Sequence, residues 1–250
     1  MSNACPSVTV SIVSHGQWAM VRPLIDQLHA HCRSVVAQIV VTINIPEEAQ
    51  HCEQWDLPVE FIRNASPRGF GANHNQAFAL CTSPWFLVLN PDIRLATDVL
   101  SPMVGQASPE VGLLAPRIRE PGKIEPEPYR ALLTPAELLR RRRPQHEPPR
   151  QPAWVAGMFM LLRGEAFAKV GGFDERYFMY CEDFDLCARL LLAGWQLRIA
   201  EDTFVMHEAQ RASNAALRPL AWHVASLLRV WSSPAFWRYF FHLRREPSRQ

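Results

Sequence analysis

Two oxygen-bearing side chains follow directly after a short, uniformly apolar segment. Residues 85–89 are Trp-Phe-Leu-Val-Leu, and Asn90-Pro91-Asp92 comes next. The apolar run predicts a buried, parallel strand, and open α/β sheets bind ligands at the carboxyl ends of their strands. On an extended backbone the oxygens of Asn90 and Asp92 point to the same side. They could bind a hard divalent cation on a diphosphate, although Asn-Pro-Asp is also typical of a simple turn.

A second set of candidates for chemistry is the acidic group Glu182, Asp183 and Asp185, at the start of an expected helix. Helix N-termini favour carboxylates, and Asp185 could simply pair with Arg189 four positions later. However, residues 177–181 before the group are mostly aromatic. An acid at a helix start beside apolar walls is where a general base can be tuned toward neutral pH. The structural and the catalytic interpretation both stay open on these residues.

A single histidine, His207, ends the last expected strand before a polar run. A lone histidine is most often structural or on the surface. Imidazole nevertheless suits manganese-like ions when carboxylate and amide oxygens are also available.

The elements that would position these residues alternate between strands and helices in the first half of the chain. We expect strands at 8–14, 35–43, 59–63 and 85–90, a helix with Val21, Leu24, Ile25 and Leu28 on one face, and a helix at 72–81. This alternation predicts an α/β fold with βαβ units and a mostly parallel sheet.

The second half is less regular. We expect a helix at 98–107, strands at 111–116, 154–162, 195–199 and 203–206, a helix at 165–170 ended by Gly171-Gly172, and a helix through Leu186, Leu190 and Leu191 to Gly194. Residues 119–152 are rich in Pro, Arg and Glu, which predicts a mobile loop over the functional edge with a short helix at 136–143. A disordered linker is the alternative. Gly157 lies inside an expected strand, where glycine often allows close approach of backbone or ligand.

Composition excludes several classes of protein. The chain has 250 residues, 20% charged, with a formal net charge of +2, so nothing indicates nucleic-acid binding. Its six cysteines form no CxxC pair, and the polar N-terminus is not a secretory signal. Reduced thiols in a cytoplasmic protein are therefore expected in preference to disulfides. No apolar stretch reaches the roughly 18 residues that a membrane span needs.

The order and spacing of the motifs are specific as a set. They run from strand 8–14 through Asn64-x-x-x-x-Gly69-Phe70-Gly71-Ala72-Asn73, Leu89-Asn90-Pro91-Asp92, Gly157, Gly171-Gly172-Phe173-Asp174 and Glu182-Asp183-x-Asp185-Leu186-x-x-Arg189 to Gly194 and His207. Over about residues 8–213, this set resembles family 2 glycosyltransferases, and most of all their rhamnosyltransferase-like branch in bacterial polysaccharide assembly. The resemblance implies a GT-A fold, in which a Rossmann-like nucleotide half and an acceptor half share one sheet. We expect this domain at 1–215 and a C-terminal helical tail at 216–250.

The resemblance also implies roles for individual residues. Asp92 would bind Mg2+ or Mn2+ on the sugar-nucleotide diphosphate, with His207 as the late metal-binding histidine, and Asn90 replaces the first acid of the family's metal motif. Asp183 would be the catalytic base. Residues implied near the acceptor or the sugar are Glu182, Asp185, Trp154 and Gly157, and those implied in the nucleotide-sugar pocket are Ser14, His15, Asn44, Arg68, Gly69, Asn73 and Asn90.

The implied activity is inverting, metal-dependent transfer of a sugar, with rhamnose from dTDP-rhamnose as one candidate donor. The acceptor would be a cell-surface glycan or a lipid-linked glycan. The chain departs from the family after its second strand. Many members have Val-Asp-Asn-x-Ser there, with an acid that reads the base, but this chain has Val41-Thr42-Ile43-Asn44-Ile45-Pro46-Glu47, so the nucleotide is not predicted. A sugar nucleotidyltransferase and a non-catalytic nucleotide-sugar binding protein are the alternatives. The first would need a Gly-rich basic loop after the first strand, and Ser14-His15-Gly16-Gln17 is a poor match.

The C-terminal tail combines large apolar and basic residues, and Pro234 predicts two helices. Trp, Phe and Arg together suit an amphipathic helix on an anionic membrane surface. We therefore expect a cytoplasmic enzyme with peripheral contact at the inner membrane. Packing of the tail on the domain, or on the partner in a homodimer, is the alternative.

Overall fold

The computed structural model describes residues 7–49, 54–141, 143, 147–208 and 217–245. The expected boundary between domain and tail at 215/216 lies outside these residues, as do Cys5 and Cys52. Within the described part of the chain, Cys32, Cys81, Cys181 and Cys187 are free thiols, as expected.

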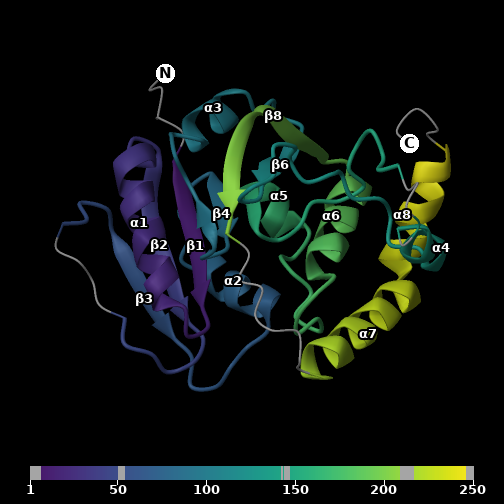
Figure 1. Ribbon diagram of the computed structural model, residues 1–250, viewed down its shortest axis with the longest axis horizontal. Coiled ribbons are helices and arrows are strands. Elements are labelled where there is room, and N and C mark those ends of the chain that lie inside the picture. Colours follow the sequence, from purple (N-terminus) through teal and green to yellow (C-terminus); the bar gives the residue numbers. More distant parts are fainter. Residues whose placement is uncertain (1–6, 50–53, 142, 144–146, 209–216, 246–250) are drawn as a thin grey trace.

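The first half of the chain forms the parallel part of the sheet, as predicted (Figure 1). Its elements are β1 (Val8–Ser14), α1 (Trp18–Cys32), β2 (Val36–Ile43), β3 (Val59–Arg63), α2 (Phe70–Phe78) and β4 (Trp85–Leu89). Strand β1 lies between β2 and β4 and is parallel to both. The carboxyl ends of β1, β2 and β4 therefore meet at one edge of the sheet.

The second half completes an eight-stranded mixed sheet in the order β3-β2-β1-β4-β7-β6-β8-β5. Its elements are β5 (Ile93–Arg94), α3 (Leu100–Gly105), β6 (Val111–Arg119), α4 (Pro135–Arg140), β7 (Phe159–Arg163), α5 (Gly164–Lys169), α6 (Glu182–Leu192), β8 (Gln196–His207), α7 (Leu217–Ser232) and α8 (Pro234–Arg245). Strand β7 is antiparallel to both of its neighbours, β4 and β6. The sheet is parallel in the first half and mixed in the second.

Strand β4 is buried on both faces, which explains its continuous apolar run. Trp85, Leu87 and Leu89 belong to the core on one side of the sheet. Phe86 and Val88, which alternate with them, belong to the core on the other side. Because every residue of β4 is buried, the chain can become polar only where the strand ends, at Asn90.

Strands β6, β7 and β8 in the second half differ from the prediction. Strand β7 begins at Phe159, not Trp154, since the preceding residues turn to contact helix α6 and the 130–131 segment. The two late strands are one strand, β8, whose pairing with β6 is interrupted between Ala200 and Phe204. Strand β6 extends to Arg119, three residues beyond the predicted end.

The C-terminal tail forms two helices separated at Ser233, as Pro234 predicted. Helix α8 packs on α6 (Figure 1). Phe236 and Tyr239 are buried against Phe184, with ring centroids 6.0 and 6.3 Å away. The Tyr239 hydroxyl also donates to the carbonyl oxygen of Ala153 at 2.7 Å. This face of the tail is part of the domain's core.

Candidate active site

Two strands bring Asp92 and His207 together. Ile93 of β5 pairs with His207 of β8, and the N–H of Glu208 donates to the carbonyl oxygen of Asp92 at 2.9 Å. The Asp92 Oδ2 atom lies 3.2 Å from the Nε2 atom of His207. The other oxygen, Oδ1, is buried and has no hydrogen-bond partner among the described residues. The predicted meeting of these two distant residues is confirmed, and one carboxylate oxygen remains available for a ligand.

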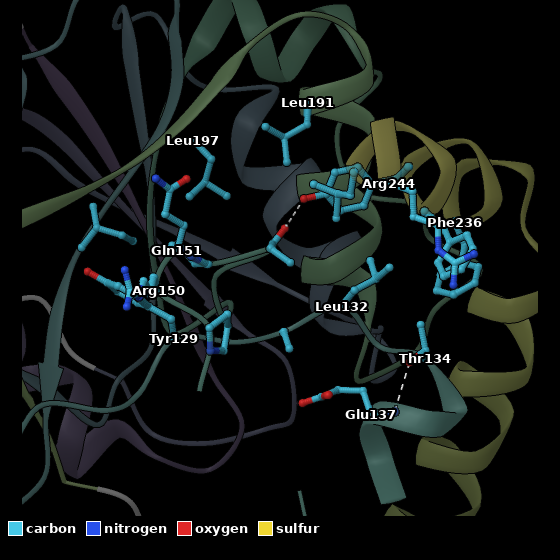
Figure 2. Close-up of a pocket in the computed structure, with 18 of the residues that line it drawn as sticks. Tyr129, Leu132, Thr134, Glu137, Arg150, Gln151, Leu191, Leu197, Phe236 and Arg244 are labelled. Atoms are coloured by element: carbon cyan, nitrogen blue, oxygen red, sulfur yellow. Dashed lines mark hydrogen bonds between the residues drawn. The ribbon is translucent and has the colours of Figure 1, made fainter. Parts of the chain in front are cut away.

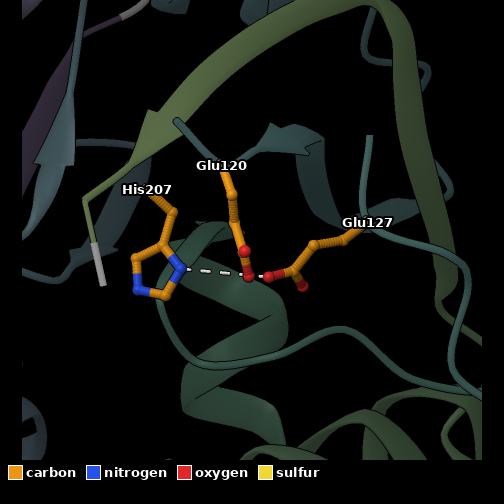
Figure 3. A group of neighbouring side chains, drawn as sticks. All are labelled: Glu120, Glu127 and His207. Atoms are coloured by element: carbon orange, nitrogen blue, oxygen red, sulfur yellow. Dashed lines mark ion pairs between the residues drawn. The ribbon is translucent and has the colours of Figure 1, made fainter. Parts of the chain in front are cut away.

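Glu120 and Glu127 flank the other side of the imidazole (Figure 3). One ligand atom from each of these two residues and from His207 lie within 4.8 Å of one another. Glu127 Oε1 is 3.9 Å from His207 Nδ1. Pairing of Arg119 with Met206 places Glu120 beside the histidine. Neither glutamate was predicted from the sequence, because the strand was expected to end at residue 116 and residues 119–152 were expected to form a mobile loop.

The imidazole of His207 binds a proton more tightly than an ordinary histidine does. Its hydrogen bond with Asp92, and then its contact with Glu127, raise the pKa of His207 to about 9. The same contact with His207 lowers the pKa of Glu127. Without a cation, His207 is therefore protonated at neutral pH and its charge stabilises the surrounding carboxylates. Carboxylate oxygens and imidazole nitrogen are ligands that suit Mn2+, and the oxygens also suit Mg2+, so these residues fit a divalent cation in place of the proton.

Asp183 lies at the start of α6 and is held by backbone groups. Its Oδ2 atom accepts a hydrogen bond from the N–H of Gly157 at 2.9 Å, and its Oδ1 atom accepts one from Phe184 at 2.8 Å. A Cβ atom at Gly157 would lie 3.1 Å from the ring of Phe70 and 3.6 Å from the Cβ of Asp183. Glycine at 157 therefore allows the close backbone approach that the sequence predicted, in a turn before β7 and not inside the strand.

The chain enters α6 through a strained turn. Tyr180 and Cys181 both have positive φ values, 72° and 66°. Such values are uncommon for residues other than glycine and cost free energy. The turn leads into the start of α6, where Asp183 accepts from the N–H of Gly157.

Glu182 and Asp183 form a pair of acids in different environments. Burial, and then the charge of Asp183, raise the pKa of Glu182 to about 8. Its Oε2 atom is buried without a partner among the described residues. Burial also raises the pKa of Asp183, but the N–H groups of Gly157 and Phe184 oppose that rise. At neutral pH Glu182 is therefore mostly protonated, and the two N–H groups favour the carboxylate form of Asp183.

Asp185 is not brought to the same side of the helix. Its Oδ2 atom is 2.7 Å from Arg189 Nε, which confirms the pairing considered from the sequence. Arg189 also donates to the carbonyl oxygens of Val170 and Gly172 at 2.7 and 2.8 Å. Two positions along a helix correspond to about 200° of rotation, so Asp185 points away from Asp183 and stabilises the turn that ends α5.

Adjacent residues connect the two halves of the site. The N–H of Asn90 donates to the carbonyl oxygen of Met158 at 2.9 Å, and the neighbouring Gly157 donates to Asp183. The Asn90-Pro91-Asp92 segment and the acidic helix start therefore lie at the same end of β4 and β7. The side chain of Trp154 is used in packing. Its Nε1–H donates to the carbonyl oxygen of Ala131, and its ring packs edge-on against the ring of Phe184.

The residues expected around the nucleotide lie together, but the polar groups of several of them form hydrogen bonds with other residues of the protein. Asn44 accepts from the N–H of Arg68 at 2.8 Å and donates to its carbonyl oxygen at 3.0 Å. Asn73 donates to the same carbonyl oxygen at 3.2 Å. These two buried amides fix the loop that precedes α2. The Arg68 guanidinium turns to Gln76 and Glu175, at 2.9 and 3.3 Å.

Ser14, His15 and Gly69 complete this edge of the sheet. The buried Ser14 hydroxyl accepts from the N–H of Gln17 at 3.1 Å, so it holds the turn after β1. His15 is exposed, with Nδ1 3.2 Å from Asn44 Nδ2. A Cβ atom at Gly69 would lie 2.7 Å from the carbonyl oxygen of Phe178, which explains the glycine by close approach. His15 is thus the member of this trio whose side chain faces solvent.

Comparison with known proteins gives a consistent result. The family described as "Glycosyl transferase family 2" matches residues 9–171. The chain is 34% identical over 161 residues to the N-acetylglucosaminyl-diphospho-decaprenol L-rhamnosyltransferase of Mycobacterium tuberculosis, covering 57% of this chain and 52% of that protein. It is 28% identical over 246 residues to the rhamnosyltransferase WbbL of Escherichia coli K12, covering 89% and 91%. The chain thus spans about half the length of the first relative and most of the second.

Solved structures share the fold at low sequence identity. A structure of GalNAc-T7 with UDP, GalNAc and Mn2+ aligns with a TM-score of 0.70 at 17% identity, covering 93% of this chain and 49% of that one. The mannosyltransferase PcManGT from Pyrobaculum calidifontis, in complex with GDP-Man and Mn2+, aligns with a TM-score of 0.63 at 15% identity, covering 97% and 76%. At these identities the likeness establishes the arrangement of helices and strands alone.

Proposed function

Because this chain belongs to glycosyl transferase family 2, we propose that it transfers a sugar, with inversion, from a nucleoside-diphosphate sugar to a hydroxyl of a glycan or lipid-linked acceptor. It is a glycosyltransferase with the GT-A fold that the sequence resemblance implied. The observation that carries the proposal is the shared location of Asp92, His207 and Asp183 at one end of β4 and β7. Two relatives are named as rhamnosyltransferases, which makes rhamnose our candidate sugar.

Asp92 and His207 would hold the divalent cation. The unpartnered Oδ1 of Asp92 and the Nε2 of His207, next to Oδ2, offer oxygen and nitrogen ligands. Glu127 would then fix the ring through Nδ1, since metal-binding histidines usually donate their second N–H to a carboxylate. We propose Mg2+ or Mn2+ as the cation. When bound, it would offset the negative charge on the departing nucleoside diphosphate.

Asp183 would act as the base. The N–H groups of Gly157 and Phe184 hold its two oxygens in place, and Glu182 next to it remains protonated at neutral pH, because its pKa is about 8. Asp183 would remove the proton from the acceptor hydroxyl as that oxygen attacks the anomeric carbon. A single base with in-line displacement inverts the anomeric centre, by the same logic that distinguishes inverting glycosidases. Glu182 would donate a hydrogen bond to the acceptor or the sugar.

The nucleotide would lie at the carboxyl ends of β1 and β2. His15 is exposed there, while Asn44 and Asn73 stabilise the loop that carries Arg68 and Gly69. We propose that these two amides position the pocket and that His15 and the loop backbone contact the nucleotide.

Peripheral contact with a membrane is our proposal for the tail. No helix among the described residues is long and apolar enough to cross a membrane. Large apolar side chains are exposed along α7 and α8, on the side that does not pack on α6: Val224, Leu228, Trp237 and Phe241. Arg238, Arg244 and Arg245 lie on α8. This combination suits the surface of an anionic bilayer.

Nucleotide binding tests the proposed function. A thermal-shift screen of nucleoside diphosphates with Mn2+ should find one that raises the melting temperature, since a ligand that binds the native state stabilises it by mass action. Calorimetry of that nucleotide should show loss of affinity in EDTA and in Asp92→Ala. Binding that is equal in Mn2+ and EDTA, and unchanged in Asp92→Ala, would exclude the proposed metal site.

A further inference from the structure

The larger of the two described cavities lies away from the acidic residues. It has a volume of about 1140 Å³, is open to solvent on one side, and is lined by parts of residues 129–137 and 149–153, the end of α6, the start of β8, and α8 (Figure 2). Neither Asp92, Asp183 nor His207 lines it. Figure 2 shows Leu191, Leu197, Tyr129, Phe236 and Arg244 arranged around a common central space. The cavity is large enough for a substantial ligand.

The walls of this cavity combine apolar and basic side chains. Its apolar lining comes from several elements: Leu132, Leu191, Leu197, Ile199, Phe236 and Leu243. Four arginines also line it: Arg140, Arg150, Arg198 and Arg244. Between residues that the structure describes, no ion pair involves any of these four.

The two carboxylates of the cavity each have a partner of their own. Glu137 pairs with Arg141 at 3.4 Å, and Glu201 accepts from the Tyr129 hydroxyl and lies 3.9 Å from Arg117. Arg141 and Arg117 do not line the cavity. The lining therefore offers a surplus of uncompensated positive charge next to apolar surface, which complements an amphiphile with an anionic group and a hydrocarbon chain.

A smaller cavity shares lining residues with the larger cavity and is also lined by residues that contact the active site. The smaller cavity, of about 50 Å³, shares Tyr129, Pro152 and Ile199 with the larger. It is also lined by Glu127 and Met158, which contact His207 and Asn90. Leu191 lies eight positions after Asp183 on α6, a separation of about 12 Å along the helix axis. A ligand that extends over this distance would reach from the larger cavity toward Asp183.

From this placement we propose that the larger cavity binds the hydrocarbon chain and the phosphate groups of a lipid-linked acceptor, namely a sugar joined through a diphosphate to a prenyl-type alcohol. This inference rests on the proposed function, because it assigns a binding site to the acceptor of that reaction. The hydrocarbon chain packs against the leucines, Ile199 and Phe236, and the arginines pair with the diphosphate. A concave wall suits a single lipid molecule, whereas a bilayer surface contacts convex faces such as the exposed side of α7 and α8.

Calorimetry on the full chain, with farnesyl diphosphate as the probe below its aggregation concentration, tests the assignment. Inorganic pyrophosphate and farnesol are the two partial probes. Since the cavity offers both charge and apolar surface, farnesyl diphosphate should bind at least about tenfold more tightly than either partial probe. Pyrophosphate that binds as tightly as farnesyl diphosphate would reduce the cavity to an anion site and overturn the proposal.

Variants locate the binding. Arg150→Gln and Arg198→Gln should each weaken farnesyl diphosphate about tenfold, as expected for loss of a charge-assisted hydrogen bond. Arg244→Gln should do the same, while its matched control Arg238→Gln, on the same helix but outside the cavity, should not. Leu197→Trp and Leu191→Trp fill the cavity from two different elements and should remove binding of the chain. Unchanged affinity in all cavity variants whose circular dichroism is that of the wild type would overturn the proposal.

Two further measurements distinguish failure of the lipid site from failure of the proposed glycosyl transfer. Release of nucleoside diphosphate from the donor, with water as acceptor, should be the same in Leu197→Trp as in the wild type. Absence of release in the wild type, with farnesyl diphosphate still bound, would contradict the proposed function and leave the lipid site supported. Farnesyl diphosphate that associates only with added anionic vesicles, and not with the protein in solution, would contradict the lipid site alone.

Discussion

At the scale of single residues, the site contains two glutamates whose pKa values are shifted in opposite directions by their surroundings. Burial gives Glu182 a pKa of about 8, whereas contact with His207 lowers the pKa of Glu127. The resemblance to the family predicted that Asp92, Asp183 and His207 would share one site. Asp92 and His207 are in contact, and Asp183 lies at the same end of β4 and β7 through its bond with Gly157. Glu120 and Glu127 were not predictable, since their place depends on where β6 ends and how a segment rich in Pro and Arg folds back.

The pKa of Glu182 leads to a prediction about stability. Its pKa rises from 4.5 in the unfolded chain to about 8 in the native state, so the native state loses stability as the pH rises through this interval. Glu182→Gln imitates the protonated acid and should have little effect at pH 4. At pH 9 it should increase the free energy of unfolding by at least about 1.4 kcal/mol, the equivalent of one pKa unit. Urea denaturation at both pH values measures the difference.

An exposed acid provides the control for that measurement. Glu165→Gln, on the exposed side of α5, should change stability equally little at both pH values. If Glu182→Gln gave the same change in stability at pH 4 and pH 9, the assigned protonation of Glu182 would be wrong.

Substitutions around His207 should reveal which side of the ring holds the cation. With the cation between Asp92 and Nε2, Glu127→Gln should weaken Mn2+-dependent nucleotide binding about 10- to 100-fold, as loss of a carboxylate partner of a metal-binding histidine does. Glu120→Gln should change it less than about threefold, because Glu120 would touch neither the cation nor the ring's donor. Calorimetry at fixed Mn2+ distinguishes the variants. Equal, large losses in Glu120→Gln and Glu127→Gln, with no loss in Asp92→Asn, would place the cation on the other side, among Glu120, Glu127 and Nδ1.

At the scale of helices and strands, patterns that depend on local chemistry were predictable and those that depend on tertiary contacts were not. Strands β1 and β3 have their predicted ends, because β-branched runs are bounded there by turn residues. The start of β7 was misplaced because Trp154 and Val155 are apolar for another reason: they pack in the core near α6 and α8. The same packing places one face of α8 in the core.

The packing of α8 predicts different effects for two phenylalanines on the same helix. Phe236 is 2% exposed and Phe241 is 53% exposed. Phe236→Ala should lower the free energy of unfolding by about 3–5 kcal/mol, the usual cost of removing a buried phenylalanine. Phe241→Ala should lower it by less than about 1 kcal/mol. Chemical denaturation of both variants tests this; equal losses would show that α8 is not part of the cooperative core.

Phe241 has a second expected effect. If the exposed side of the tail contacts an anionic bilayer, Phe241→Ser should reduce co-flotation with phosphatidylglycerol vesicles while leaving the melting temperature nearly unchanged. Flotation that is equally strong in this variant and in the wild type, or absent in both, would contradict membrane contact through this face.

At the scale of the whole molecule, one sheet joins a parallel half, which carries the loop with Arg68 and Gly69, to a mixed half beside the acidic residues. Antiparallel strand β7 is the connection, since it lies beside β4, and the turn before it contacts both Asn90 and Asp183. Alternating strands and helices predicted the parallel half. The mixed half was not predicted in detail, because antiparallel pairing of β7 and the long β8 arises from contacts between residues far apart in sequence.

The most direct test of the account is a transfer assay with a nucleoside-diphosphate sugar, Mn2+ and a lipid-linked acceptor, comparing the wild type with Asp183→Asn. Loss of a general base typically costs 10²- to 10⁴-fold, so turnover should fall by about that factor while the affinity for nucleotide stays within about threefold of the wild type. Asp202→Asn, an exposed acid on β8, is the matched control and should keep full turnover. Undiminished turnover in Asp183→Asn would show that Asp183 is not the catalytic base.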